Sequence, residues 1–131
     1  MSLPTYIDFA FDGLKIRAIH GSPQSFFDYI YPDTPDDVIA PWLADLTCDY
    51  LLASHTHVPM IRKLSKLAIL NPGSAGQPRD GDWRASYMIF DTATHELENA
   101  RLEYDIDKTC DRIRRSMPHA DELIAILKRG Y

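Results

Sequence analysis

Cysteine is scarce in this chain, and the two that occur, Cys48 and Cys110, lie far apart without the spacing of a metal-binding pair. We therefore expect reduced cysteines rather than a disulfide, which is typical of a cytoplasmic protein. No apolar run approaches the length needed to cross a membrane. Positive charge is also in deficit, since the formal net charge is -5 at pH 7. That balance argues against membrane-surface binding and against general nucleic-acid binding through a basic field.

The remaining composition is ordinary for a globular protein. Apolar residues make up 45% of the 131 residues and charged residues 25%, so we expect one domain that buries a real core. The acidic balance does not exclude phosphate chemistry, because bound metal ions can supply local positive charge.

Apolar periodicity predicts a mixed arrangement of strands and helices. A helix is expected from Thr34, as its cap, with Pro35 at its first position and an apolar stripe running to Leu46. Further helices are expected after Asp105 or Asp107 and over about residues 120–128. Short apolar runs predict strands at residues 6–11, 14–19, 49–53, 60–64, 67–70, 85–90 and 97–104. The fold class is therefore α/β (α+β), with mixed sheets flanked by helices.

Histidines follow two of the predicted strands. His20 ends the run 14–19, and His55 and His57 follow the run 49–53. The intervening helix predicts a parallel crossover, which would bring both strand ends to one edge of the sheet. In an extended segment, residues two apart point to the same side, so His55 and His57 are expected to present both rings to one volume. Neutral imidazole is a common metal ligand, although His-x-His alone also fits a polar loop.

A loop over residues 21–33 carries four aromatic side chains between the first histidine and the predicted helix: Phe26, Phe27, Tyr29 and Tyr31. Two readings remain open for this loop. It could form a lid or wall beside the histidines, or its rings could be a small satellite of the core. His95 falls in a predicted turn, and no function is assigned to it.

The ordered set of motifs resembles the calcineurin-like metallophosphoesterase superfamily, in particular its small prokaryotic phosphodiesterases. The matching motifs are His20-Gly21, Ser54-His55-Thr56-His57, Asn71-Pro72-Gly73-Ser74, Pro78-Arg79 and a strand that contains Tyr87. Ser54 is a departure, since the family usually has glycine there. The resemblance covers nearly the whole chain and is to the carboxyl-terminal half only. It implies that residues 1–131 form one domain equivalent to half of an α/β/β/α sandwich.

The resemblance also implies a ligand set and a reaction. His20 and His55 would bind one metal and His57 the other, in a binuclear site for Mn, Zn, Fe or Ni. The implied activity is hydrolysis of a phosphodiester or phosphomonoester by a two-metal mechanism. Arg79 is a candidate contact for the substrate phosphate, because arginine suits bidentate binding of oxyanions, but an ordinary surface arginine is an equal alternative.

The family's amino-terminal ligand motifs do not occur in this sequence. The chain has no Asp-x-His and no Gly-Asn-His, and its one Gly-Asp, at Gly81-Asp82, follows the histidine pair instead of preceding it. A separate or upstream amino-terminal half would have to supply the bridging carboxylate. We therefore expect this chain to be inactive alone and to form homo-oligomers through uncovered apolar faces around Ile7, Phe9 and Phe11 and around Leu51 and Leu52.

Two other functions remain open from the sequence. The chain could be a non-catalytic scaffold that binds proteins, as a retromer subunit of this superfamily does. It could also be a mononuclear metal-binding protein, because three imidazoles and a water can hold one Zn²⁺.

Overall fold

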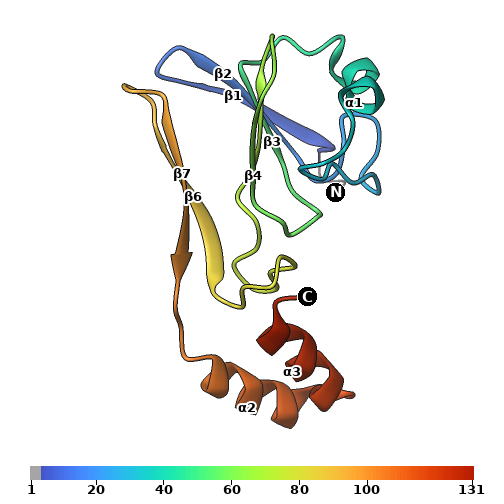
Figure 1. Ribbon diagram of the computed structural model, residues 1–131, viewed down its shortest axis with the longest axis vertical. Helices are drawn as coiled ribbons and strands as arrows, with labels where there is room; N and C mark the ends of the chain where they lie inside the picture. The colour runs from blue at the N-terminus through green and yellow to red at the C-terminus, as the bar shows by residue number, and fades with distance from the viewer. Residues whose placement is uncertain (1–3) are drawn as a thin grey trace.

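A five-stranded mixed sheet carries most of the core in the computed structural model, which describes residues 4–131 (Figure 1). The strands run in the order β1-β2-β3-β5-β4. β2–β3 and β3–β5 are parallel, whereas β1–β2 and β4–β5 are antiparallel. The strand bounds are β1 Tyr6–Phe11, β2 Leu14–Ile19, β3 Tyr50–Ala53, β4 Met60–Lys63 and β5 Ala68–Asn71. The mixed α/β class expected from the sequence is therefore confirmed.

The crossover between β2 and β3 is made by helix α1, Asp36–Leu43, as the sequence predicts. Its residues Ile39 and Leu43 are buried against the sheet in a cluster with Leu51 and Ile69. The predicted cap is wrong by one position, because Pro35 is the capping residue and no side chain caps the helix. Thr34 instead accepts a hydrogen bond from the Tyr31 N–H at 2.8 Å.

A second, two-stranded sheet stands beside the first (Figure 1). It consists of β6, Ala85–Asp91, and β7, Glu96–Leu102, paired antiparallel. Its turn approaches the β1–β2 turn, where the Thr92 hydroxyl donates to the Asp12 carboxylate at 2.5 Å. Between the two sheets lies an apolar cavity of about 430 Å³. The hairpin thus covers only part of the sheet face that it approaches.

The uncovered part of that face is apolar. Ile7, Phe9 and Phe11 of β1 remain 57%, 44% and 58% exposed, as the sequence analysis expects. The same expectation is wrong for Leu51, which is fully buried in the cluster beneath α1. The reason is the alternation of strand side chains, which directs Leu51 to the helix side while Leu52 lines the cavity between the sheets.

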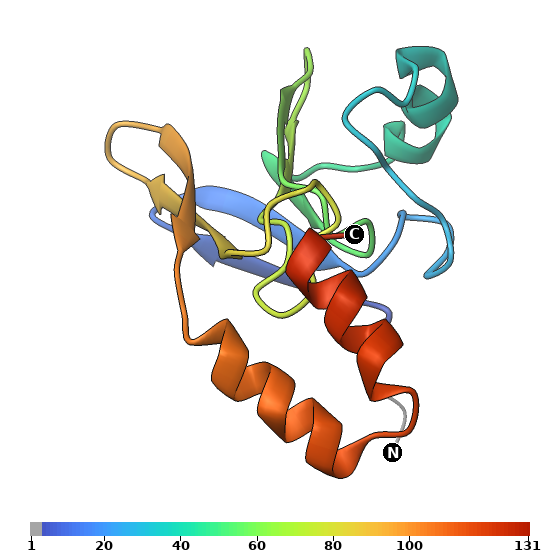
Figure 2. The same ribbon diagram turned by 60° about the horizontal axis from the view of Figure 1, so that its bottom comes forward.

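The carboxyl-terminal helices form a separate antiparallel pair (Figure 2). α2, Ile106–Ser116, is capped by Asp105, and α3 covers Ala120–Arg129. Their contact is made by the buried Cys110, Ile124 and Leu127. Gly130, with φ of 70°, ends α3, and its carbonyl accepts from the Gly81 N–H at 3.0 Å. This bond ties the end of the chain to the loop between β5 and β6.

The other strands and helices lie where the sequence predicts, with ends shifted by a few residues. Both cysteines are free thiols. Over residues 4–131, none of the helices is long and apolar enough to cross a membrane.

Replacing Ile69 with alanine tests the core at the centre of the sheet. Ile69 has no exposed surface, so Ile69→Ala should lower the free energy of unfolding by about 2–5 kcal/mol. Ile61 on the neighbouring edge strand is 36% exposed, and Ile61→Ala should cost less than half as much. Urea denaturation measures both. Equal losses would contradict this assignment of the core.

Candidate metal and phosphate site

The ends of β2 and β3 bring two of the predicted histidines into contact. Ile19 and Ala53 are partners in the parallel register, so His20 and Ser54 follow at the same edge. The Ser54 N–H donates to the His20 carbonyl at 3.0 Å and extends the ladder by one bond. His20 Nε2 and His55 Nδ1 then face each other at 2.8 Å. The expectation that the parallel crossover unites these strand ends is confirmed.

The backbone at the histidine pair is not the extended segment assumed from the sequence. His55 and His57 have φ of 69° and 61°, which are left-handed values. The Thr56 N–H donates to the Ser54 carbonyl at 2.8 Å and closes a γ-turn around His55. A γ-turn with positive φ is rare, and a conformation of this kind costs about 1–3 kcal/mol. The strained turn, and not strand alternation, therefore sets where the two rings point.

His57 is oriented by a different segment. Its Nδ1 lies 2.7 Å from the Gln77 carbonyl oxygen, which can only accept, so this nitrogen carries the proton. Nε2 is then the nitrogen with a free lone pair. A histidine held in this way by a carbonyl is typical of metal ligands. The His57 carbonyl also accepts from the Arg79 N–H at 3.2 Å, so Gln77 and Arg79 of one loop contact the same histidine.

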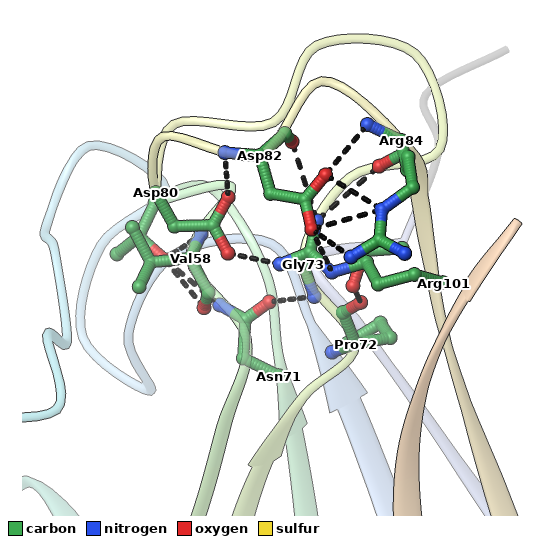
Figure 3. A network of polar contacts seen from close by, with 10 residues as sticks. Val58, Asn71, Pro72, Gly73, Asp80, Asp82, Arg84 and Arg101 are labelled. Atoms are coloured by element: carbon green, nitrogen blue, oxygen red, sulfur yellow. Dashed lines mark hydrogen bonds and ion pairs between the residues drawn. The ribbon is translucent and has the colours of Figure 1, made fainter. Parts of the chain in front are cut away.

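The loop from Ser54 to Val58 is held by the buried side chain of Asn71, at the end of β5 (Figure 3). Asn71 Nδ2 donates to the Thr56 hydroxyl at 2.9 Å and to the Ser54 carbonyl at 3.2 Å. Its Oδ1 accepts from the Gly73 N–H at 2.9 Å. The Thr56 hydroxyl, also buried, accepts from the Val58 N–H at 3.2 Å. One amide thus braces the residues on both sides of His55 and the turn that follows β5.

Gly73 is required in that turn for two reasons. Its φ is 77°, and a Cβ there would lie 2.7 Å from the Ser86 hydroxyl oxygen. Ser86, which is buried in β6, donates to the Pro72 carbonyl at 2.7 Å. The Asn-Pro-Gly-Ser turn is therefore packed between Asn71 and the hairpin.

A network of aspartates and arginines holds the loop after this turn (Figure 3). Arg101 of β7 pairs with Asp80 and donates to the Arg84 carbonyl at 3.2 Å. Arg84 donates to the Asp82 carboxylate at 2.6 Å, and this bond is the main cause that lowers the pKa of Asp82 to about 2. The loop is therefore anchored by ion pairs immediately after Arg79.

The charges around His55 favour its neutral form. Burial lowers the pKa of His55, and His20, His57 and Arg79 lower it further. Neutral imidazole is the form that binds metals. Arg79 itself is exposed. Within residues 4–131, however, no group of three or more His, Cys, Asp or Glu side chains is arranged to hold a metal ion.

Comparison with known proteins decides the family. The family model described as a calcineurin-like phosphoesterase superfamily domain matches residues 1–95.

The chain belongs to the calcineurin-like phosphoesterase superfamily.

Similar proteins occur in archaea and bacteria. An uncharacterised protein of Methanocaldococcus jannaschii is 33% identical over 129 residues, which cover 86% of this chain and 51% of that protein. A hypothetical protein of Pyrococcus horikoshii superposes with a TM-score of 0.84 at 27% identity, covering 98% of this chain and 52% of that one. A metallophosphoesterase of Sphaerobacter thermophilus superposes with a TM-score of 0.82 at 29% identity, covering 99% of this chain and 59% of that one. The chain therefore spans only about half the length of these relatives.

The roles of three residues around the histidines are decided only by the structure. Tyr29 stacks on His55 with ring centroids 4.2 Å apart. At this position the aromatic loop therefore forms a wall beside the histidines and not a satellite of the core. The sequence indicates Asn71 only as part of a turn, and it does not distinguish Arg101 from other charged residues. The position of Asn71 at the end of a buried strand could have indicated its role, because buried amides need hydrogen-bonding partners. Arg101 carried no such signal in the sequence.

Replacing Asn71 with aspartate tests the bracing of the histidine loop. The substitution keeps the shape but removes the two N–H bonds and places a carboxylate against the Ser54 carbonyl. We expect Asn71→Asp to lower the free energy of unfolding by about 3 kcal/mol at pH 7. Asn99→Asp, at an exposed position of β7, is the matched control and should change it by less than about 0.5 kcal/mol. Urea denaturation of both variants decides, and similar losses would refute the bracing role.

Proposed function

We propose that this chain is a single domain, equivalent to the carboxyl-terminal half of a metal-dependent phosphoesterase that hydrolyses phosphodiesters or phosphomonoesters. The observation that carries the proposal is the meeting of His20 Nε2 and His55 Nδ1 at 2.8 Å beside a third histidine with an oriented ring. Free thiols at both cysteines agree with a reducing compartment, so we place the protein in the cytoplasm.

The donor set fits part of a binuclear site. Imidazole nitrogens bind Zn²⁺ at about 2.0–2.1 Å, so two ligands of one ion lie within roughly 4 Å of each other, as His20 and His55 do. His57, with its Nε2 free, would hold the second ion. Mn, Zn, Fe or Ni would suit these nitrogens. When bound, the ions supply positive charge for the phosphoryl transition state and a water activated for attack.

The chain's own residues would orient and balance this site. The Gln77 carbonyl keeps the His57 proton on Nδ1, and the pKa of His55 is lowered by burial and by its neighbours. Arg79, whose N–H contacts the His57 carbonyl, would bind a phosphate oxygen of the substrate. None of these side chains is a carboxylate, so the acid ligands have to come from another segment.

We assign that role to an amino-terminal half, carried upstream or on a separate chain. Relatives are about twice as long as the matched segment. The apolar face formed by Ile7, Phe9 and Phe11 continues beside the cavity between the sheets, where further strands could pack. In the absence of that half, a second copy of this chain would cover the face.

The two alternatives receive less support. A protein-binding scaffold could use the same apolar face, but it has no need for histidines held by the Asn71 and Gln77 contacts. A mononuclear site would need His20, His55 and His57 around one ion, and these three do not form such a group among the described residues.

Titration with Zn²⁺ or Mn²⁺ tests the histidine site. The wild-type chain should bind the ion loosely, and His55→Ala should bind it at least about ten-fold more weakly. Even the loss of a residue that only hydrogen-bonds to a metal ligand lowers metal affinity by about that factor. His95→Ala is the matched control because His95 also has a positive φ, of 59°. Calorimetry measures the heats. The proposal is wrong if wild type and His55→Ala give the same heat.

Arg79 is tested in an enzyme assembled with the missing ligand motifs. With a chromogenic phosphodiester as substrate, Arg79→Ala should lower kcat/KM by about ten-fold or more. This is the loss expected when one hydrogen bond from a charged group to the transition state is removed. The exposed Arg112 of α2 provides the control substitution Arg112→Ala. Unchanged kinetics for Arg79→Ala would remove it from the site.

The isolated chain should self-associate and be nearly inactive. Its exposed apolar strand recruits a second copy, but a second copy brings no carboxylate ligands. Light scattering and a phosphodiesterase assay with added Mn²⁺ are run on one sample. A monodisperse monomer contradicts the exposed-face argument, and robust metal-dependent turnover contradicts the need for the missing ligands.

A further inference from the structure

One aromatic side chain covers a face of the His55 ring. Tyr29 stacks on His55 with ring centroids 4.2 Å apart and planes inclined by 26°. His20 meets the same imidazole at its edge, with centroids 4.6 Å apart and planes inclined by 63°. The His55 ring is thus held by Tyr29 on a face and by His20 at Nδ1.

The position of Tyr29 is set by the loop that carries it. Ile30, the next residue, is buried in the core cluster with Leu51 and anchors the chain there. The start of the loop is closed by the Ser22 hydroxyl, which donates to Asp28 at 2.6 Å. Gly21 permits this closure, because a Cβ there would lie 2.6 Å from the Phe26 carbonyl oxygen. Tyr29 is therefore presented from a braced loop, although the residue is 41% exposed.

We propose that Tyr29 is a positioning residue that holds the His55 imidazole with Nδ1 toward His20. The proposal rests on the proposed function, in which these two rings share a metal ion. His55 needs such support because it lies in a strained turn and, among residues 4–131, its ring makes one hydrogen bond, to His20. Rotation of the ring would turn Nδ1 away, and a flat ring stacked at van der Waals distance opposes that rotation.

Three variants separate this role from general packing. Tyr29→Phe keeps the aromatic face and loses only the hydroxyl. Tyr29→Leu keeps apolar bulk and loses the flat face. Tyr31→Leu is the matched control, because Tyr31 stacks on Tyr29 with centroids 5.6 Å apart and is equally exposed, at 40%. Circular dichroism confirms that each variant is folded.

The first measurement needs no metal. The ring nitrogens of His55 are followed by ¹⁵N NMR at one pH, at which the imidazoles are neutral. Wild type, Tyr29→Phe and Tyr31→Leu should show one protonated and one unprotonated nitrogen, with Nδ1 paired to His20. Tyr29→Leu should show averaged nitrogen signals, because a ring that has turned away from His20 is no longer held in one tautomer and exchanges between the two. An unchanged pattern in Tyr29→Leu, or equal averaging in Tyr31→Leu, overturns the proposal.

The second measurement is the affinity for Zn²⁺ alone. Tyr29→Leu should bind about ten-fold more weakly than wild type, with Tyr29→Phe restoring the affinity. Full affinity in Tyr29→Leu overturns the positioning role. If the wild-type chain binds no Zn²⁺ while averaging is confined to Tyr29→Leu, the positioning role stands and the proposed metal site fails. The two ideas therefore fail separately.

Discussion

The buried amide of Asn71 is the interaction on which the arrangement of the histidines depends. Its N–H groups reach the Ser54 carbonyl and the Thr56 hydroxyl, and its oxygen accepts from the Gly73 N–H. A backbone with positive φ at two histidines that are separated by one residue would relax without such contacts, because each left-handed residue carries a cost. Since Asn71 is fully buried, breaking these bonds would leave its polar groups without water.

The three histidines are held by three different parts of the chain. His20 follows β2, His55 is braced from β5 through Asn71, and His57 is oriented by the Gln77 carbonyl of the following loop. That loop is in turn anchored to the second sheet by Arg101. A change in the hairpin can therefore reach His57 without altering the five-stranded sheet. The site is an assembly of loops at one sheet edge, stabilised from both sheets.

Charge limits what the metal site that we propose at these histidines could do alone. Neutral imidazoles bind divalent ions but do not offset their charge, so two ions close together require carboxylates. Two acids of the loop that carries Arg79, Asp80 and Asp82, are already paired with Arg101 and Arg84. The resemblance to the family implies acid ligands that precede the histidines in sequence. This chain covers about half the length of the relatives that it matches.

Much of the fold could be predicted from the sequence because its signals are local. Apolar periodicity placed the strands and helices, the strand-helix-strand order predicted the parallel pair, and the ordered histidine motifs indicated the family. The geometry of the site depended on contacts between distant residues. The γ-turn at His55, the stack of Tyr29 and the Asn71 contacts join segments that are separate in sequence. Sequence periodicity reports which face of a strand is apolar, whereas the direction of a loop side chain is decided only when the folded chain supplies its hydrogen-bonding partners.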